Sequence, residues 1–298
     1  MPTTSTWLST ANPKAGHIGK ALLGAVLPSV SQPNSRISKI TVSLPRKDSL
    51  SDLQRQFHKS LHLVNFVTQR NVEAATNSDA VLLAFPPDKI HEVLEDSGMR
   101  EGLKDKIIIS ILARTPWEKV EHILTNGGPG SNPSPHQDYR IIRAMPTIGA
   151  GIYESATLLS SANLDTNKPA HRDALDFTAA IFSSLGRVFR IPNDYFDRAT
   201  GMSAVSNALT TVAVQAIVKN AAAHGISEEH AIAIAAQCIR GTASVMLSGV
   251  HPDQLEHWLS APGSITEQAI AGVKDGQLDK SLERVLSVAV CRARDHRS

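Results

Sequence analysis

The stretch of sequence that decides the fold is residues 80–112, AVLLAFPPDKIHEVLEDSGMREGLKDKIIISIL. Its two short apolar runs, Ala80–Ala84 and Ile107–Leu112, are typical of buried strands. Between them, Pro87–Glu95 has the apolar spacing of an amphipathic helix. A strand, a helix and a strand in this order predict a βαβ unit whose parallel strands are covered on both faces.

The same alternation extends over about the first two thirds of the chain. Further strands are expected at Ile40–Ser43, Leu63–Phe66, Arg140–Arg143 and Arg187–Ile191. Further helices are expected at Gly19–Leu27, Ser49–Ser60, Trp117–Leu124 and Arg172–Leu185. We therefore predict that residues 1–193 form an α/β domain with a mainly parallel sheet.

Residues 194–298 predict a second, all-α domain, because helical runs follow one another there with no convincing strand. These runs are Ala208–His224, Glu228–Ser248 and Gln277–Arg294. The segment SNALTTVAVQAIVKNAAAHG, residues 206–225, is apolar on most faces and must be buried on nearly all sides. Its burial predicts a helical interface in a homodimer, with a central helix in a monomer as the alternative.

Composition excludes several classes of protein. The 298 residues suffice for two domains, since a single core stops growing at roughly 250–300 residues. The net charge of +2 is spread along the chain, which argues against a nucleic-acid partner. No apolar run approaches the ~20 residues that span a bilayer, and the N-terminus MPTTSTWLSTANPK lacks the features of a secretory signal. We expect a soluble, cytoplasmic protein with no membrane partner.

The cysteines and histidines predict no metal site. Cys238 and Cys291 lie in expected helices without a CxxC partner, and buried thiols are predicted rather than a disulfide or a zinc site. The sequence has no HExxH motif. The separate histidines are expected to be exposed or to cap helices; these include His91, His224, His230 and His251.

Several stretches resemble pyrroline-5-carboxylate reductases, and most closely the fungal ones, in the order and at the spacing of that family. They are AGHIGKALLGAVL, DAVLLAFPP, IIISILA, RIIRAMPTIGAGIYES, FSSLGRVFRIP, ATGMSAVSNAL, IRGTASVMLSGVHP and LSAPGSITEQAIAGV. The resemblance implies an N-terminal Rossmann domain that binds NADPH or NADH and a helical C-terminal domain that dimerises by swapping helices. It also implies hydride transfer to the C=N bond of a cyclic imine, at a site between the two domains.

In this resemblance, the dinucleotide loop corresponds to KAGHIGKALL. Gly16, His17, Ile18 and Gly19 are the expected cofactor-binding residues, with Lys14 in place of the family's first glycine. Three interpretations stay open: Lys14 offers the phosphates a cation, the cofactor has been abandoned, or the first residues come from a misassigned gene start.

Two further segments are expected to meet the cofactor. Arg46 and Lys47 follow the second strand and would bind the adenosine 2′-phosphate, which favours NADPH over NADH; the alternative is a solvated charge pair on a turn. A later loop would approach the ribose and nicotinamide, and its residues are Ala84, Phe85, Pro86 and Pro87. Pro86 replaces a lysine of the family and removes both a charge and a backbone donor.

The substrate residues are also altered. Thr147 stands where the family has asparagine, and the family's Ser-Gly-Ser-Gly-Pro run corresponds here to residues 203–207. There Ser203, Ser206 and Asn207 are expected to contact the substrate, while Val205 removes a hydroxyl.

The loop that cradles the substrate carboxylate in the family corresponds to residues 261–266. Gly263, Ser264 and Thr266 are its expected site residues, and Ile265 replaces a small polar one. We expect a substrate that is larger or less polar than pyrroline-5-carboxylate, because an anion without donors in a closed site is poorly solvated. Proton transfer to the imine is assigned to Thr266, Ser203 or a bound water.

The leading hypothesis is therefore an NADPH-dependent imine reductase in specialised metabolite biosynthesis. The alternatives are a non-redox isomerase or cyclase on a repurposed scaffold, or a catalytically silent dimeric homologue.

Overall fold

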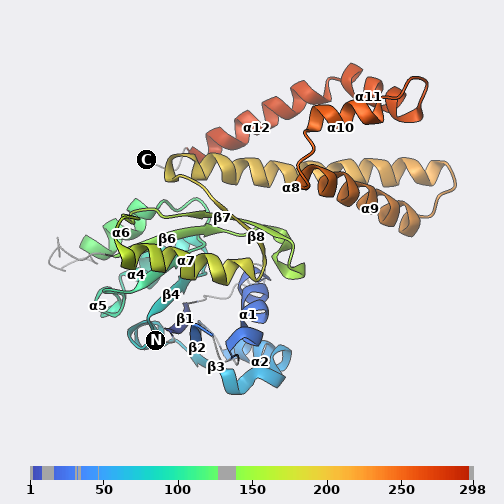
Figure 1. Cartoon of the computed structure of the whole chain (residues 1–298). Coiled ribbons are helices and arrows are strands. Elements are labelled where there is room, and N and C mark those ends of the chain that lie inside the picture. Colours follow the sequence, from blue (N-terminus) through green and yellow to red (C-terminus); the bar gives the residue numbers. More distant parts are fainter. Residues whose placement is uncertain are drawn as a thin grey trace. The chain divides into compact units, whose positions relative to one another are not determined.

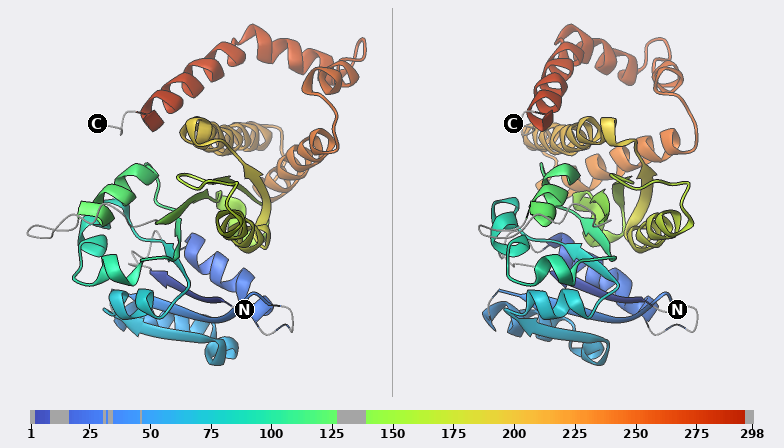
Figure 2. Two further views of the ribbon diagram at one scale, coloured as in Figure 1. Left: turned by 60° about the vertical axis from the view of Figure 1, so that its left-hand side comes forward. Right: turned by 90° about the vertical axis from the view of Figure 1, so that its left-hand side faces the viewer.

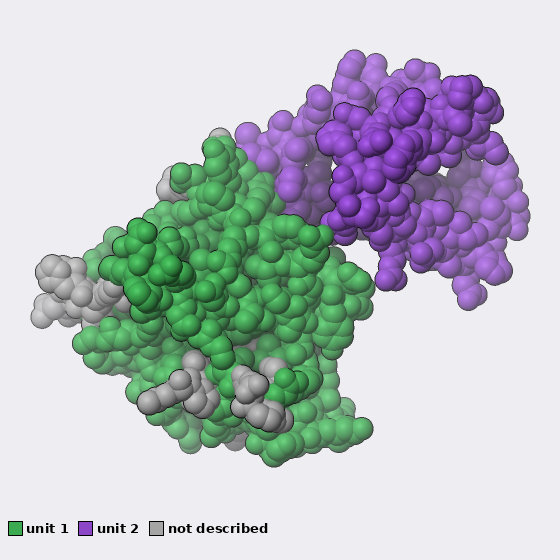
Figure 3. All heavy atoms as spheres, viewed as in Figure 1, with its two compact units in different colours: residues 1–200, 293–298 green, residues 201–292 purple. Residues whose placement is uncertain are grey.

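A computed structural model describes residues 3–8, 17–30, 32, 35–45, 47–126 and 139–294. The chain divides into two compact units, one of Met1–Thr200 with Ala293–Ser298 and one of Gly201–Arg292 (Figure 3). The division between the units falls after Thr200, within the helix Asn193–Ala223.

The first unit is built on an 8-stranded sheet with the strand order β3-β2-β1-β4-β5-β6-β7-β8 (Figure 1). The strands are β1 Thr3–Leu8, β2 Ile37–Leu44, β3 Val64–Thr68, β4 Ala80–Leu83, β5 Ile107–Ser110, β6 Arg140–Met145, β7 Ser155–Ser160 and β8 Gly186–Arg190. Every neighbouring pair is parallel except β6 and β7. The predicted Rossmann-type, mainly parallel sheet is therefore confirmed.

Helices and short 3₁₀ turns connect these strands. The α-helices of the first unit are α1 His17–Val30, α2 Lys47–Gln56, α3 Asn71–Thr76, α4 Ile90–Leu94, α5 Met99–Gly102, α6 Trp117–Asn126 and α7 Pro169–Ser183. The 3₁₀ turns are η1 His58–Leu63, η2 Pro87–Lys89 and η3 Ile148–Ile152. The views of Figure 2 show the sheet between its helices.

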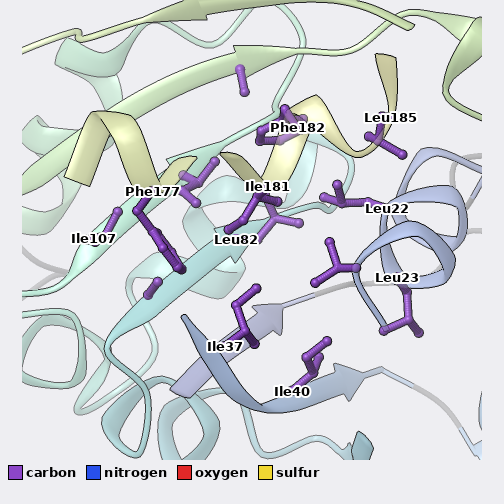
Figure 4. Close-up of a cluster of buried hydrophobic side chains, with 14 of the residues drawn as sticks. Leu22, Leu23, Ile37, Ile40, Leu82, Ile107, Phe177, Ile181, Phe182 and Leu185 are labelled. Atoms are coloured by element: carbon purple, nitrogen blue, oxygen red, sulfur yellow. The ribbon is translucent and has the colours of Figure 1, made fainter. Parts of the chain in front are cut away.

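Alternate residues of each central strand face opposite sides of the sheet, and both sides are buried. In β4, Ala80 and Leu82 belong to one apolar cluster, while Val81 and Leu83 belong to another. The first cluster lies under α1 and α7, where Leu22 and Phe182 meet the strands (Figure 4). The second lies under helices α3 to α6. This double burial explains why the central strands are continuous apolar runs.

Two strands were not expected from the sequence. β1 has the sequence TTSTWL, yet it lies in the middle of the sheet between β2 and β4. Pairing with β2 and β4 satisfies the backbone N–H and C=O groups of β1, and this pairing does not require apolar side chains. In β7, Ser155 Oγ and Thr157 Oγ1 are 3.0 Å apart, so two buried hydroxyls satisfy each other.

The last strand, β8, forms an exposed edge of the sheet and is strongly basic for its length. Arg187 Cζ lies 5.5 Å from the centre of the Phe189 ring, and Arg190 forms an ion pair of 2.6 Å with Asp176. These contacts hold both guanidinium groups on the edge strand.

The rest of the described chain is helical, as predicted. Its helices are α8 Asn193–Ala223, α9 Glu228–Leu247, α10 Pro252–Leu259, α11 Ile265–Asp275 and α12 Leu278–Arg294. α10 and α11 were not expected. α8 begins in the first unit and continues into the second.

The second unit has almost no apolar core of its own. Among its described residues, Ala231 and Ala235 are the buried apolar side chains, whereas Val212 on α8 is 62% exposed. The prediction of buried cysteines was wrong for this single chain: Cys238 and Cys291 are exposed, because nothing covers their faces of α9 and α12.

Two described helices, α8 and α9, have the length and composition to cross a membrane, with only 6% and 11% of their apolar windows buried. This is weak evidence for a membrane, because helices that pack against other protein have the same composition.

Tyr139 allows a test of the packing beneath α6. Its side chain is 1% exposed, and its hydroxyl lies 3.4 Å from the carbonyl oxygens of Arg100 and Leu124. Burial raises the pKa of Tyr139 to about 12.

Tyr139→Phe loses the two hydroxyl contacts at every pH, but it should change the pH dependence of stability only in the alkaline range. Tyrosine in the unfolded chain ionises near pH 10, so the raised pKa stabilises the fold fully below that pH, and the contribution is lost as the pH rises toward 12. Between pH 9 and pH 11, the wild type should lose about 1.3 kcal/mol of unfolding free energy that Tyr139→Phe retains. Urea unfolding at both values measures this difference. The exposed Tyr195→Phe should behave as the wild type, and an equal loss in Tyr139→Phe would contradict the assignment.

Candidate functional site

The carboxyl ends of five neighbouring parallel strands lie at one edge of the sheet. Leu8 at the end of β1 pairs with Ser43 and Leu83, and Ser110 at the end of β5 pairs with Leu83 and Arg143. The segments that leave these strands therefore emerge at the same edge. In open α/β sheets, this edge is where ligands bind.

The expected dinucleotide loop is only partly within the described residues. Lys14 and Gly16 lie outside them, as does Arg46. His17 begins α1, followed by the half-buried Ile18. A Cβ added at Gly19 would meet no atom within 4 Å, so this glycine leaves open space rather than allowing close packing.

The end of β2 presents neutral groups. The buried Ser43 hydroxyl donates to Asn71 Oδ1 at 2.7 Å, and Leu44 beside it is buried. Lys47 begins α2 shortly after this point. Ser43 and Leu44 carry no negative charge, so they would not repel the 2′-phosphate of a dinucleotide.

The segment after β4 offers the cofactor little more than main chain. Phe85 is buried in the second apolar cluster, beside the half-buried Ala84. Pro86 and Pro87 have no backbone N–H and lead into η2, where the Lys89 N–H donates to the Pro86 carbonyl at 2.9 Å. Pro86 and Pro87 therefore offer a ligand no backbone donor.

Thr147 follows β6 at the same edge and has a defined orientation. Its N–H donates to Ser155 Oγ at 3.0 Å, and its Oγ1 accepts from the Ala156 N–H at 3.0 Å. A hydroxyl that accepts keeps its own proton. Thr147 can therefore still donate one hydrogen bond to a ligand.

The buried Arg143 forms an ion pair with the partly buried Asp197, which the sequence did not reveal. Arg143 is 4% exposed, its guanidinium lies 2.7 Å from Asp197 Oδ1, and its Cζ lies 4.3 Å from the centre of the Phe196 ring. The pair joins β6 to the first turns of α8. No local motif predicts it, because its members are far apart in sequence.

A cavity of about 630 Å³ lies within the first unit beside α1. Its lining residues are Ile18, Lys20, Ala21, Gly24, Gln56, Phe57, Ile148, Ala150, Gly151 and Tyr153. Of the expected cofactor residues that the structure describes, only Ile18 lines it. Ile148 is 75% exposed, so η3 presents an apolar side chain beside the cavity.

The expected substrate residues of the second unit fall into two groups. Ser203, Ser206 and Asn207 lie on α8 within little more than one turn, so they share a face. The Ser206 hydroxyl donates to the Met202 carbonyl at 3.0 Å, within its own helix.

The second group surrounds the start of α11. Ser264 caps this helix, and its Oγ accepts from the Glu267 N–H at 3.1 Å. The Thr266 hydroxyl donates to the Leu259 carbonyl and lies 3.1 Å from Ser264 Oγ. Gly263 has a φ of 75°, a left-handed conformation that favours glycine, and its N–H donates to Glu267 Oε2 at 2.7 Å.

Glu267 was missed by the sequence reasoning, although a signal was present. Ser264 followed three residues later by Glu267 is the pattern of a capping box, in which the two side chains satisfy amides at a helix start.

Among the described residues, no group of three or more His, Cys, Asp or Glu side chains could hold a metal ion. His91, His224, His230 and His251 are exposed, and His251 caps α10.

Comparisons with known proteins agree with this architecture. A family model for pyrroline-5-carboxylate reductase dimerisation matches residues 193–296, and one for NADP oxidoreductases, coenzyme F420-dependent, matches residues 15–114. The chain is 29% identical to a delta-1-pyrroline-5-carboxylate reductase from Curvularia clavata, over 96% of this chain and 90% of that protein. It is 30% identical to a pyrroline-5-carboxylate reductase from Synechocystis, over 78% of each chain.

A solved structure shares the fold over its whole length. A pyrroline-5-carboxylate reductase from Coxiella burnetii superposes with a TM-score of 0.79 and 24% identity, covering 100% of both chains.

The Arg143–Asp197 pair can be tested by substitution. Arg143→Met removes a buried guanidinium and its hydrogen bond to the partly buried Asp197, and we expect a loss of about 1–3 kcal/mol in the free energy of unfolding. Arg190→Met removes an exposed pair with Asp176 and should cost less than about 1 kcal/mol. Urea unfolding compares the two. Similar losses would show that the Arg143–Asp197 pair has no special role.

Proposed function

The chain belongs to the pyrroline-5-carboxylate reductase family, and we propose that it is an NAD(P)H-dependent reductase of a cyclic imine. The observation that carries the proposal is the convergence of five strand ends and the start of α1 at one edge of the sheet. The match to NADP oxidoreductases over residues 15–114 covers this same region. Because several of the family's cofactor and substrate residues are replaced in this chain, we assign the reaction to a specialised biosynthetic route.

The described residues fit a dinucleotide. The N-terminus of α1 offers amide donors for the phosphates, and Gly19 leaves the space that a close approach needs. Ser43 and Leu44 add no negative charge at the end of β2, while Arg46 and Lys47 follow in sequence. We infer that NADPH is preferred over NADH. When bound, the cofactor supplies the hydride that reduces the C=N bond.

The protein's own task is to orient the imine and to support its protonation. Thr266 donates its hydroxyl proton to the Leu259 carbonyl, which makes it a poor proton donor in this arrangement. Thr147 keeps its proton, and we propose that it binds the substrate or the cofactor amide. Ser203 is retained as the residue assigned to proton transfer, directly or through water.

A non-redox isomerase or cyclase is the second candidate. The segment after β4 favours it, because Pro86 removes the charge and the backbone donor of the family's lysine and Phe85 is buried. Such an enzyme would use the same fold without a nicotinamide.

We also propose a homodimer that covers α8 and α9. A groove of about 700 Å³ runs along these helices, and its lining includes Val214, Val218 and Ile232. The match of residues 193–296 to a dimerisation family supports a second copy as the cover. A dimer of this kind buries the apolar helices in protein, as expected for a cytoplasmic enzyme.

Cofactor preference provides the test of the reductase proposal. The double variant Arg46→Ala/Lys47→Ala should weaken NADPH binding about tenfold or more and leave NADH binding unchanged, because only NADPH has the 2′-phosphate. Nicotinamide fluorescence titration measures both affinities. Lys104→Ala/Lys119→Ala removes two exposed charges elsewhere and should change neither. Absence of NADPH and NADH binding in the wild type would favour the isomerase or a silent homologue.

The dimer is tested separately. Val212→Asp places a charge on the exposed apolar face of α8, and burying an unpaired charge in an interface is costly. Light scattering should give a dimer for the wild type and a monomer for this variant. The control Lys104→Asp should remain dimeric. A wild-type monomer at micromolar concentration would refute the proposal.

A further inference from the structure

The cavity beside α1 lies along a different face of this helix from the one that meets the sheet. Leu22 and Leu23 of α1 belong to the apolar core (Figure 4). Ile18, Ala21 and Gly24 line the cavity instead, and their spacing of three residues puts them on one side of the helix. The cavity therefore follows α1 for about 9 Å, since each helical residue adds ~1.5 Å.

Two aromatic rings contribute to the cavity wall. Phe57 follows α2 and is half-buried, and its Cε1 would lie 3.6 Å from a Cβ added at Gly24, so this ring faces the backbone of α1. Tyr153 follows η3 and is 60% exposed. Together with the aliphatic side chains of Ile18 and Ile148, these rings offer the apolar surface that a planar aromatic ligand needs.

Tyr153 occupies its place in spite of backbone strain. Its φ is 63°, in the left-handed region that bulky residues rarely adopt. The turn before it is fixed, because the Glu154 N–H donates to the Gly149 carbonyl at 3.0 Å and a Cβ added at Gly149 would collide with the Glu154 backbone. Strained residues are concentrated at functional sites, and a glycine or an asparagine would adopt this φ with less strain. The strain therefore indicates a role for the Tyr153 side chain in the cavity.

Three polar side chains on the cavity wall are free to bind a ligand. Among the described residues, no hydrogen bond or ion pair involves the side chains of Lys20, Gln56 or Tyr153. Lys20 is half-buried and carries the only charge among the described lining residues, and α1 contains no acidic residue. One ammonium group beside apolar surface suits a ligand with one negative charge, because the two charges then balance.

We propose that this cavity is a binding site for a small planar aromatic carboxylate, with the carboxylate on Lys20 and Gln56 and the aromatic ring against Phe57 and Tyr153. Its volume of about 630 Å³ is within the range of small-molecule sites, which are mostly apolar with a few polar groups. The site is separate from the edge that suits a dinucleotide, because much of its wall comes from the end of α2 and from η3.

Two matched probes test the site in the full chain without cofactor. 2-Naphthoate is a planar aromatic carboxylate, and 2-naphthamide has the same rings without the charge. Calorimetric titration should show one 2-naphthoate bound per chain, about tenfold or more tightly than the amide. Lys20→Met keeps the apolar stem and removes the charge, so it should weaken 2-naphthoate binding about tenfold and leave 2-naphthamide binding unchanged. Lys119→Met on α6, which packs against the other apolar cluster, should change neither affinity.

Two further variants test the apolar wall. Tyr153→Asn removes the ring and relieves the strain, because asparagine tolerates a positive φ. It should weaken the binding of both probes about tenfold, and urea unfolding should show no loss of stability. Gly24→Leu fills the cavity beside Phe57 and should abolish the binding of both probes. The helix should persist in this variant, because leucine is a better helix former than glycine and its Cβ makes only ordinary contacts.

Three results would overturn the proposal. The first is no binding of 2-naphthoate at millimolar concentration, and the second is equal affinity of the wild type for the two probes. The third is binding that survives both Lys20→Met and Gly24→Leu, since the probe would then lie elsewhere, for example on the exposed apolar helices of the second unit. None of these results depends on whether NADPH binds, so this site and the reductase proposal can fail separately.

Discussion

The structure of the first unit depends on one constraint: the central strands of its sheet must be buried on both faces. In β4 and β5, successive residues belong alternately to the two apolar clusters, so neither face can be left to water. Helices must therefore lie on both sides of the sheet, and parallel strands with crossover helices satisfy this requirement. The strand ends then collect at one edge. The site follows from the burial of the strands rather than from any single residue.

The second unit has no such internal constraint. Its helices are set by local signals, such as Ser227 at the start of α9 and Gly225 just before it, yet they enclose few apolar side chains. In proteins most helical stability comes from the tertiary packing of an apolar face. These helices match a family model for dimerisation, and the proposed homodimer would supply such packing.

The helices and strands could be predicted from the sequence where their apolar pattern was long or continuous. β4, β5, α8 and α9 are of this kind. β1 and β7 were missed because backbone pairing and a hydroxyl pair compensate for their polar residues, which a pattern of side chains does not record. Residues 252–259 and 265–275 were assigned to the all-α domain without helix bounds of their own, although Ser264 and Glu267 form a capping signal. At the site, the residue types could be predicted, but the hydrogen-bond partner of each hydroxyl could not. The Thr266 hydroxyl donates to the Leu259 carbonyl, and Arg143 pairs with Asp197. Both contacts join residues that are not neighbours in sequence, so only the folded chain reveals them.

The basic edge strand has a consequence for how copies of the chain can meet. An uncovered strand exposes unpaired main-chain groups on which another sheet can continue its ladder. On β8, Arg190 is paired with Asp176, but a second copy arriving in this way would bring the Arg187 charges of both copies to the shared edge, which opposes a continuous intermolecular sheet. The protein can therefore display large apolar helices for assembly while its sheet resists fibril-like growth.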